Sequence, residues 1–284
     1  MLLRSAAACQ GARRRNSGAS CASSGRRGGM QGGDIDGTST PAATASGSSP
    51  PPLAGEYHCA DFDWDDHRVA CEGVLRERLA SQPMPGAHEV AGKLEAQDAR
   101  WESFHTRQNK SRKFFKARRY IVQEFPRLLD PDMRRVVEFG CGNGSSVVPV
   151  LMGNPGVAVT AVDFSEAAVQ HAEASVRAAA GVDASRCAFG VADVAASDLL
   201  DRPGRPPGLG PAQADAVLLM FTLSAIPPGA PMARAVANAA ACLRPGGSVF
   251  LRDYGMYDLA QLRFPQAQRL GGETLFHRGD GTLR

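Results

Sequence analysis

The feature that most constrains the fold of this 284-residue chain is an alternation of short apolar runs with helical stretches over residues 135–251. The runs are rich in aliphatic and β-branched side chains, and they predict strands at 135–139, 157–162, 187–192, 216–221 and 248–251. Helical spacing lies between them at 165–180 and 231–243. Apolar strands that alternate with helices are typical of a parallel sheet covered on both faces. We therefore predict an α/β fold with a mostly parallel sheet.

The first predicted strand runs directly into a glycine-rich turn, EFGCGNG (138–144). Glycines at a strand-to-helix turn allow positive φ and let the backbone approach a ligand closely. The spacing is G-x-G-x-G, whereas dinucleotide-binding turns have G-x-G-x-x-G and seat a pyrophosphate on the helix N-terminus. No Lys or Arg lies within the turn to bind a phosphate. The turn therefore predicts a small-molecule site that is not built for a pyrophosphate.

Two aspartates follow the next two predicted strands. Asp163 comes 23 residues after Gly140, where a carboxylate can accept hydrogen bonds from both ribose hydroxyls of a nucleoside. Asp193 follows the third strand, where it can accept a hydrogen bond from the amino group of an adenine. The alternative is that both side chains only cap the helices that follow them. Capping is compatible with ligand binding, so a nucleoside-containing ligand is predicted at this edge of the sheet.

An unusual pair of charges leaves the fifth predicted strand, in FLRDYGMYDL (250–259). Arg252 and Asp253 lie at the carboxyl end of that strand, which is the edge of an open α/β sheet where ligands bind. Two interpretations stay open. Either the two charges hold a polar substrate, or they pair with neighbours and brace the loop that begins at Tyr254.

A basic and aromatic segment precedes the sheet, in a region where helices are expected at 69–80 and 91–107. Residues 100–119 contain eight Lys or Arg and one Glu, interleaved with one Trp, three Phe and one His. Phosphates attract such charges and bases stack on such rings, so the composition favours a segment that faces nucleic acid. The alternative is a solvated helix face with no ligand.

The N-terminal residues have a different composition. Residues 1–55 carry six Arg and two Asp among many Ser, Ala, Gly and Pro, which predicts a disordered tail or a transit peptide. A transit peptide would direct the chain to a mitochondrion or plastid, and otherwise a cytoplasmic location is expected. The remaining residues, 56–284, have a net charge of −1, so nucleic-acid affinity must come from a local patch.

Membrane and metal-binding classes are not favoured. No apolar run approaches the roughly 20 residues that span a bilayer, so we expect no membrane partner. The seven cysteines are scattered and lack a C-x-x-C spacing, which argues against a disulfide framework. His58, Cys59, His67 and Cys71 lie close in sequence but match no familiar zinc spacing, so no metal site is predicted.

The order of Glu138, the glycine turn, Asp163, Asp193 and the Pro-Gly-Gly turn in LRPGGS (243–248) resembles class I S-adenosylmethionine-dependent methyltransferases. More specific stretches resemble the tRNA N3-methylcytidine methyltransferase family. These stretches are FFKARRYIVQEFPRLL (114–129), VEFGCGNGSSVVPVL (137–151), VDFSEAAV (162–169), FTLSAIPP (221–228), LRDYGMYDLAQLRF (251–264) and RGDGT (278–282). The resemblance implies a Rossmann-like class I sheet with seven strands. Because five are visible before Arg284, we expect a sheet truncated after its fifth strand, with an N-terminal helical extension.

The same resemblance implies S-adenosylmethionine as the cofactor, with the residues that bind it. The expected cofactor-binding residues are Trp101, His105, Glu138, Gly140, Gly142, Asp163, Asp193, Val194 and Met220. Trp101 and His105 would form an aromatic cover from the N-terminal segment. The chain departs from the family pattern at His105, where members usually have Tyr, and at Ala117, where FFKDR would have Asp.

Members of this family methylate N3 of a cytidine in the tRNA anticodon loop, and the residues agree with that chemistry. The N3 lone pair can attack a sulfonium methyl group without prior deprotonation, and the ring then becomes cationic. A nearby carboxylate stabilises this charge, so we expect Arg252 and Asp253 to hold and polarise the cytosine as catalytic residues. Because N3 lies on the pairing edge, the base must be unpaired or flipped out.

Transfer RNA is therefore the expected partner. The expected tRNA-binding residues are Lys110, Arg112, Lys113, Lys116, Arg118, Arg119 and Tyr254. An accessory protein is left open, because some relatives work with an aminoacyl-tRNA synthetase, the seryl-tRNA synthetase. Two other functions also stay open: a class I methyltransferase acting on protein or a small molecule, and a catalytically inactive RNA-binding subunit. Three regions are expected: the tail at 1–55, a helical segment at 56–130 that faces tRNA and covers the cofactor, and the methyltransferase domain at 131–284.

Overall fold

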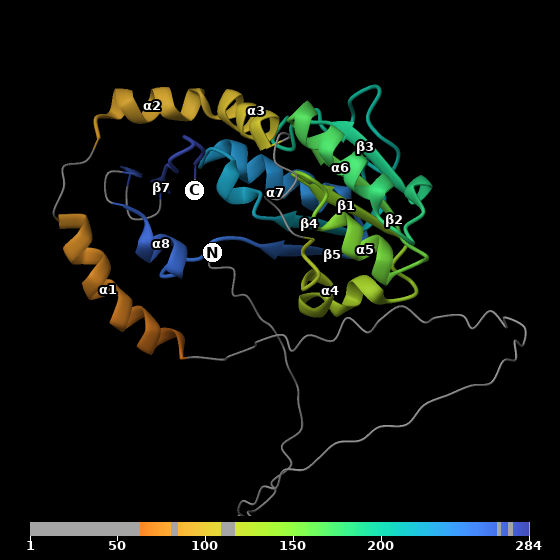
Figure 1. The fold of residues 1–284 in the computed structure, drawn as a ribbon, viewed down its shortest axis with the longest axis horizontal. Coiled ribbons are helices and arrows are strands. Elements are labelled where there is room, and N and C mark those ends of the chain that lie inside the picture. The colour runs from red at the N-terminus through yellow and green to blue at the C-terminus, as the bar shows by residue number, and fades with distance from the viewer. Residues whose placement is uncertain (1–62, 81–84, 109–116, 266–267, 272–274, 284) are drawn as a thin grey trace, which may run out of the picture. The chain divides into compact units, whose positions relative to one another are not determined.

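The computed structural model describes residues 63–80, 85–108, 117–265, 268–271 and 275–283. Their centre is a five-stranded sheet of order β3-β2-β1-β4-β5, in which every pairing is parallel (Figure 1). The strands are β1 (Arg135–Phe139), β2 (Ala158–Asp163), β3 (Cys187–Val191), β4 (Ala214–Met220) and β5 (Leu243–Arg252). The prediction of five strands that alternate with helices is confirmed. The N-terminal tail predicted at 1–55 lies outside the described residues.

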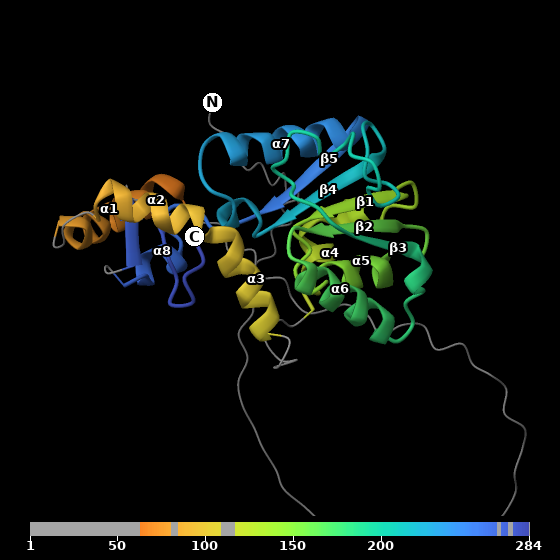
Figure 2. The ribbon, with the colours of Figure 1, turned by 90° about the horizontal axis from the view of Figure 1, so that it is seen from above.

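The sheet is buried on both faces because its central strands are apolar throughout. All seven residues of β4 are buried. Alternate residues of each strand belong to different clusters: Val136 and Leu218 pack on one face, and Val137 and Leu219 pack on the other. Figure 2 shows α5 and α6 on one side of the sheet and α7 on the opposite side. These helices are α5 (Val147–Gly153), α6 (Glu166–Ala178) and α7 (Ala230–Cys242).

Local signals in the sequence explain where the covering helices begin. The Ser165 side chain accepts a hydrogen bond from the Ala168 N–H at 3.1 Å and so caps the start of α6. Pro231 occupies the first turn of α7, where its missing N–H costs no helical hydrogen bond. Both helices agree with the predicted ranges within two residues.

Strand β5 is longer than the sequence predicts. The turn-forming LRPGGS is included in the strand, because Leu243 pairs with Ala214 and Ser248 pairs with Ala216. The four residues between Leu243 and Ser248 therefore form an irregularity opposite a single β4 residue, with Gly246 at a φ of 83°. The predicted start of this strand, at residue 248, was wrong. The turn interrupts the hydrogen-bonded pairing of β4 with β5, but the strand does not end there.

The N-terminal helices differ from their predicted ranges. The first helix begins five residues earlier than expected, and the predicted helix at 91–107 is divided at Ala96. Ala96, with φ −81° and ψ 2°, is the C-terminal cap of one helix, and the next helix begins at Gln97. The elements are α1 (Trp64–Ala80), α2 (Ala87–Glu95), α3 (Gln97–Gln108), α4 (Ile121–Glu124) and the short 3₁₀ helix η1 (Pro126–Leu129).

After β5 the chain forms short elements that contact the N-terminal helices. They are α8 (Leu259–Arg263), β6 (Arg269–Gly271) and β7 (Leu275–Phe276), and the two strands pair antiparallel in a separate sheet. Gln97 at the start of α3 is buried, and its side chain accepts from the Leu283 N–H at 3.2 Å. Arg100, one turn later, donates to the Gly281 carbonyl at 3.0 Å. Helix α3 is thus attached to the last described residues of the chain.

Helix α1 packs against the loop that follows β5. Cys71, Leu75 and Tyr257 form a small buried cluster, and the His67 ring lies 3.0 Å from the Tyr257 carbonyl. The His67 ring also lies 3.7 Å from the Cys71 Sγ, while His58 and Cys59 lie outside the described residues. Within the described ranges, no three His, Cys, Asp or Glu side chains gather closely enough to hold a metal ion.

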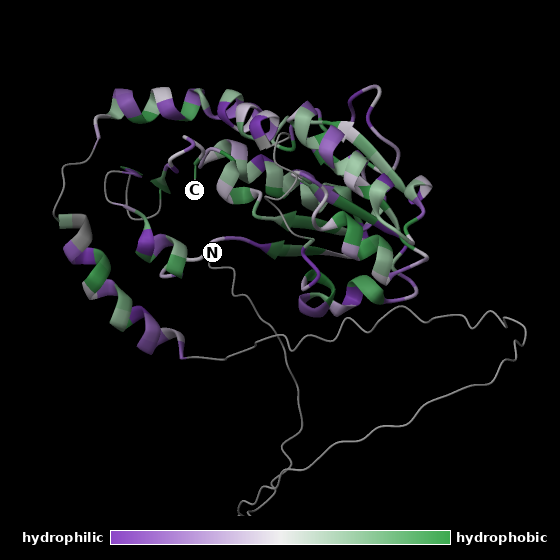
Figure 3. Cartoon of the chain, viewed as in Figure 1, coloured by the Kyte–Doolittle hydropathy of each residue, from purple (hydrophilic) through white to green (hydrophobic). Residues whose placement is uncertain are grey.

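The distribution of hydropathy follows this architecture. Figure 3 shows hydrophobic residues along the strands of the sheet, and polar residues among them on the surrounding helices. Among the described residues, no helix combines the length and the apolar character that crossing a bilayer requires. Two further 3₁₀ helices, η2 (Ala184–Arg186) and η3 (Leu223–Ala225), complete the described elements of the sheet domain.

Candidate functional site: a nucleoside-sized cavity at the carboxyl edge of the sheet

The glycine turn after β1 adopts the backbone geometry that its sequence predicts. Gly140 and Gly142 have φ values of 70° and 53°, a region that disfavours other residues. A Cβ at Gly140 would lie 2.7 Å from two side-chain atoms of Thr222, so the turn packs tightly against the segment after β4. A Cβ at Gly142 would meet only the His105 ring, at 3.8 Å. The backbone at Gly142 is therefore open on the side where a ligand would approach.

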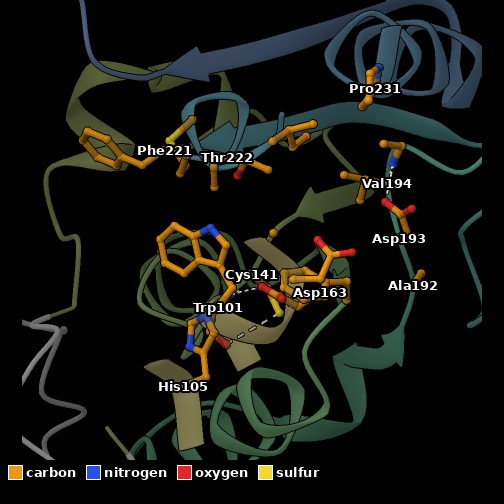
Figure 4. Close-up of a pocket in the computed structure, with 18 of the residues that line it drawn as sticks. Trp101, His105, Cys141, Asp163, Ala192, Asp193, Val194, Phe221, Thr222 and Pro231 are labelled. Carbon is orange, nitrogen blue, oxygen red and sulfur yellow. Dashed lines mark hydrogen bonds between the residues drawn. The ribbon is translucent and has the colours of Figure 1, made fainter. Parts of the chain in front are cut away.

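A cavity of about 350 Å³ lies above this turn (Figure 4). Eight of the nine predicted cofactor-binding residues line it, namely Trp101, His105, Gly140, Gly142, Asp163, Asp193, Val194 and Met220. The residues come from α3 and from the ends of β1 to β4, which meet at the carboxyl edge of the sheet. Ligands of open α/β sheets bind at this edge, and the volume lies in the range of about 300–1,000 Å³ typical of small-molecule sites.

Asp163 connects the glycine turn to the helix after β2. Its two carboxylate oxygens accept hydrogen bonds from the Gly142 N–H at 2.9 Å and the Ser165 N–H at 3.0 Å. Burial raises the pKa of Asp163, and these two N–H groups and the nearby His105 oppose the increase. A carboxylate has about four lone-pair positions, so after these two bonds Asp163 can still accept from a pair of ribose hydroxyls.

Helix α3 covers the cavity with aromatic side chains. Trp101 and His105 are buried and one helical turn apart, and their rings are stacked with centroids 5.9 Å apart. Phe104 packs edge-on against both rings, at 5.4 Å and 5.3 Å. Burial lowers the pKa of His105 although the Asp163 charge opposes this, which favours the neutral imidazole. His105 can therefore stack on an uncharged ring without adding a positive charge.

The far side of the cavity, beyond Asp163, is formed by the loop after β3. Asp193 is exposed, and its carboxylate accepts from the Ala195 N–H at 2.8 Å. Two side chains of α7 fix this loop: Arg234 donates to the Ala195 carbonyl and Asn238 donates to the Val194 carbonyl, both at 2.8 Å. The loop is thus attached to α7 at the side of the cavity that Asp193 and Val194 line.

Glu138 is the predicted cofactor residue that does not line the cavity. It is fully buried in β1, and both carboxylate oxygens lack a hydrogen bond of ordinary geometry within the described part of the chain. Burial raises the pKa of Glu138 to about 7, while the nearby Arg118 charge and Ser146 hydroxyl lower it in part. Glu138 is therefore not among the described residues that would contact a ligand in the cavity.

Arg118 has a different location from the one its basic segment predicts. We expected it on tRNA phosphates, but its side chain lines the cavity. Its Nη1 donates to the Ser146 hydroxyl at 3.1 Å and the Met220 carbonyl at 3.3 Å. The adjacent Arg119 is exposed, as a phosphate contact requires. The other predicted basic contacts, Lys110, Arg112, Lys113 and Lys116, lie outside the described residues.

The two charges after β5 lie beside the cavity and do not line it. Arg252 forms an ion pair with Glu124, and its guanidinium lies 4.8 Å from the centre of the Tyr120 ring. Asp253 accepts from the Ser224 N–H at 3.0 Å and from the Tyr254 N–H at 2.9 Å. These contacts agree with the bracing interpretation. The carboxylate oxygens of Asp253 have further lone pairs with which they can accept from a substrate.

The sequence reasoning missed several residues of the site. Asp98, Phe221, Thr222, Pro231 and Arg234 also line the cavity. Phe221 and Thr222 follow β4, and the Phe221 backbone has a φ of 61°, which is unusual for a bulky residue. Their position directly after an apolar strand was a usable signal, because ligands of open α/β sheets bind at the carboxyl ends of the strands.

Comparison with known proteins agrees with this geometry. A family model described as a methyltransferase domain matches residues 137–249, which span the glycine turn and β1 to β5. A solved glycopeptide N-methyltransferase, MtfA, complexed with S-adenosyl-L-methionine has a TM-score of 0.37 at 22% identity, covering 47% of this chain and 53% of that one. The parallel sheet and the matched family model define a Rossmann-like class I methyltransferase fold.

Curated relatives identify the family. The chain is 34% identical over 227 residues to the tRNA N(3)-methylcytidine methyltransferase trm140 of Schizosaccharomyces pombe, covering 78% of this chain and 68% of that protein. It is 33% identical over 264 residues to the tRNA N(3)-cytidine methyltransferase METTL2 of Danio rerio, covering 77% and 69%. For human METTL6 the identity is 35% over 187 residues, 64% of this chain and 61% of the relative. The chain belongs to the tRNA N3-cytidine methyltransferase family.

Proposed function

We propose that the protein transfers a methyl group from S-adenosylmethionine to N3 of a cytidine in the anticodon loop of tRNA. The observation that carries this proposal is the convergence of Asp163, Asp193 and the Trp101–His105 pair around one cavity above the glycine turn, in a chain of this family. The chain spans about two thirds of the relatives trm140 and METTL6, so its activity is a proposal about the residues present here.

The residues of the cavity fit the adenosine part of the cofactor. Asp163 would accept from the ribose hydroxyls, and Asp193 would accept from the adenine amino group. The open space at Gly142 leaves room for the ligand to pass close to the backbone. Trp101 and His105 would exclude water from above. When bound, S-adenosylmethionine supplies an electrophilic methyl group on a sulfonium.

The acceptor chemistry requires positioning more than proton transfer. The N3 lone pair of cytosine attacks the methyl carbon, the carbon–sulfur bond breaks, and the ring retains the positive charge. Asp253 would accept from the cytosine amino group and stabilise this charge. Arg252 would act as a positioning residue, because its ion pair with Glu124 fixes the end of β5 that carries Asp253. Alignment of the two reactants would supply most of the rate.

A second depression beside the cavity supports tRNA as the substrate. It is lined by Tyr254, Ala260, Arg263, Phe264, Pro265, Gln268, Arg278 and Gly279. The Tyr254 ring lies 5.2 Å from the Phe221 ring, and Phe221 lines the cavity, so one aromatic pair separates the two hollows. Guanidinium groups and aromatic rings together suit a nucleotide, because phosphates bind the charges and bases stack on the rings. We infer that nucleotides flanking the target cytidine bind here.

Mass-spectrometric nucleoside analysis of tRNA treated with protein and cofactor tests the proposal. The expected result is 3-methylcytidine, with one modified position that maps to the anticodon loop. Transfer of labelled methyl groups to protein and not to tRNA would support a protein methyltransferase instead. Cofactor binding without methylation of any tRNA, with and without added aminoacyl-tRNA synthetase, would contradict the activity proposed for this chain.

A further inference from the structure

Tyr257 has a backbone conformation that is uncommon for its residue type. It lies between β5 and α8, in the loop that begins at Asp253, and its φ is 64°. A bulky side chain disfavours this region, so such a residue keeps a positive φ only where the surrounding structure determines it. Tyr257 is not among the described residues that line the cavity, so contact with the cofactor does not account for its conformation.

Helix α1 holds Tyr257 through its carbonyl, its hydroxyl and its ring. The Nε2 atom of His67, 190 residues earlier in the chain, lies 3.0 Å from the Tyr257 carbonyl oxygen. The Tyr257 hydroxyl donates to the Glu72 carboxylate at 3.4 Å, and Arg68 donates to the same carboxylate at 2.8 Å. The Tyr257 ring is buried together with Leu75. An N-terminal helix therefore determines the conformation of a turn that follows the sheet.

Tyr257 separates the residue proposed to hold the cytosine from those proposed to bind the flanking nucleotides. Asp253 precedes it in the loop, and Arg263, which lines the second depression, follows it in α8. The Tyr257 N–H donates to the Gln261 side chain, so the turn also contacts α8 directly. Because φ and ψ are the soft dihedrals of the backbone, a change in φ at Tyr257 would reorient α8 relative to Asp253. The conformation of one residue thus relates the two parts of the proposed substrate site.

We propose that Tyr257 is a positioning residue for methyl transfer, and that α1 acts through it to orient the acceptor base. Held at positive φ, Tyr257 keeps Asp253 in one arrangement relative to Arg263, so the target cytidine and its neighbouring nucleotides are bound in one orientation. Preorganisation of this kind raises the rate, because the loop is ordered on folding and not when the substrate binds. This inference rests on the proposed function, because it assigns a residue that orients the same substrate.

Single-turnover methyl transfer, with tRNA and S-adenosylmethionine both saturating, tests this role. Tyr257→Gly tolerates the positive φ but removes the ring and the hydroxyl that α1 holds. The rate, counted per mole of protein that binds S-adenosylhomocysteine, should fall at least about 10-fold, because the reactants are no longer aligned. Tyr257→Phe keeps the ring and loses only the hydroxyl, so its rate should stay within about three-fold of wild type. Affinity for S-adenosylhomocysteine should stay within about three-fold in both variants.

Leu151→Ala is the matched control for a loss of stability. Leu151 is buried on α5, in the cluster on one face of the sheet, and its truncation leaves a cavity. Less of this variant should bind S-adenosylhomocysteine, but the rate per mole of protein that binds it should not change. The same pattern in Tyr257→Gly would assign Tyr257 a purely structural role and overturn the inference.

Hydrogen exchange tests the role of α1 without measuring activity, and it decides if Tyr257→Gly does not fold. Leu75→Ala leaves the loop sequence unchanged and removes packing from the Tyr257 ring. The N–H groups of residues 254–262 should exchange at least about 10-fold faster in this variant, and those of β4 should not change. Unchanged exchange in the loop overturns the inference and leaves the proposed function standing. A wild-type protein that methylates no tRNA overturns the proposed function and this role together.

Discussion

At the scale of single residues, a substitution at Asp253 can distinguish the two interpretations of this side chain, which are substrate binding and bracing of the loop. The Asp253 carboxylate fixes the Ser224 and Tyr254 N–H groups, and we propose that it also accepts from the cytosine amino group. Asp253→Asn keeps the volume but replaces one acceptor oxygen by a donor. We expect methyl transfer to tRNA to fall at least about 100-fold, in the range seen when a group that stabilises developing charge is removed. Affinity for S-adenosylhomocysteine should stay within about three-fold.

Asp258 provides the matched control for this substitution. It lies in the same loop, five residues further from β5, and accepts from the Gln261 and Gly255 N–H groups at 2.7 Å and 3.1 Å. Asp258→Asn thus perturbs a carboxylate that accepts from two backbone N–H groups, as the Asp253 carboxylate does. Comparable losses of methylation rate in the two variants would assign Asp253 to bracing, and so would a parallel loss of cofactor affinity in Asp253→Asn.

Glu138 makes the stability of the protein depend on pH. Burial raises its pKa to about 7 from an ordinary value of 4.5, so between these pH values the unfolded chain has released a proton that the folded protein retains. Stability therefore falls as pH rises from 5 to 7, by up to about 3 kcal/mol from this group. Glu138→Gln removes the titration, so urea unfolding should show the variant gaining stability relative to wild type between pH 5 and pH 8. A stability difference that does not change with pH would contradict the assignment, and Glu166→Gln at an exposed position is the control variant.

At the scale of secondary-structure elements, Asp215 ties together the amino ends of three strands. Its carboxylate accepts from the Arg134 and Arg135 N–H groups at 2.7 Å each, and it forms an ion pair with Arg244 of β5. Burial raises the pKa of Asp215, but the two backbone donors and Arg244 outweigh this, so the net direction is downward. The stabilisation is present at neutral pH and is lost as pH falls through the lowered pKa.

Asp215→Asn should therefore weaken the sheet without affecting the site at its opposite edge. We expect a loss of about 1–3 kcal/mol in the free energy of unfolding at pH 7, because a charge-assisted donor set loses its acceptor. Affinity for S-adenosylhomocysteine should not change. Urea denaturation and calorimetry check the two parts, with Asp198→Asn at an exposed position as the control. An unchanged unfolding midpoint would mean that water replaces these bonds at no cost.

The sequence predicted the elements best where periodicity alone decides them. The first predicted strand, 135–139, has the same first and last residues as β1. The division of α2 from α3 at Ala96 was not visible, since alanine favours helix and the break depends on how Gln97 is held by Ala225 and Leu283. Tertiary contacts therefore decide that boundary.

Tertiary contacts also limited how much of the candidate site could be predicted from the sequence. Strand ends identified Asp163 and Asp193 because parallel strands bring their carboxyl ends to one edge. Arg118 could not be placed from its basic neighbours, since charge density says nothing about which guanidinium enters the core. Its direction is set by Ser146 and Met220, residues 28 and 102 positions away in sequence.

At the scale of the described part of the molecule, distant segments of the chain meet around the cavity. Helix α3 covers the cofactor site and is attached to Gly281 and Leu283 through Arg100 and Gln97. The Arg278 guanidinium lies 6.0 Å from the centre of the Phe104 ring, and Phe104 packs against Trp101 and His105. Arg278 therefore supports both the aromatic cover and the second depression. This residue couples the proposed tRNA-binding site to the proposed cofactor site.

This arrangement predicts that both arginines of the depression contribute to RNA affinity, and that Arg263 does so without contributing to cofactor affinity. Arg263 is exposed, and Arg278 lies 3.8 Å from Asp280, whose carboxylate also accepts from the Thr282 N–H and hydroxyl. Each substitution, Arg263→Gln or Arg278→Gln, should weaken binding of a tRNA anticodon stem-loop and lower the slope of log affinity against log salt by about one. Affinity for S-adenosylhomocysteine should stay unchanged for Arg263→Gln.

Fluorescence anisotropy across a salt series measures both quantities, and Arg177→Gln is the matched control. Arg177 is exposed on α6 and pairs with Glu173 one turn away, so its loss removes one positive charge from a different face. If all three variants lower the salt slope equally, the RNA responds to the net charge of the protein and not to the depression. If only Arg263→Gln and Arg278→Gln do so, the phosphates of the substrate lie beside Tyr254, within one aromatic pair of the methyl donor.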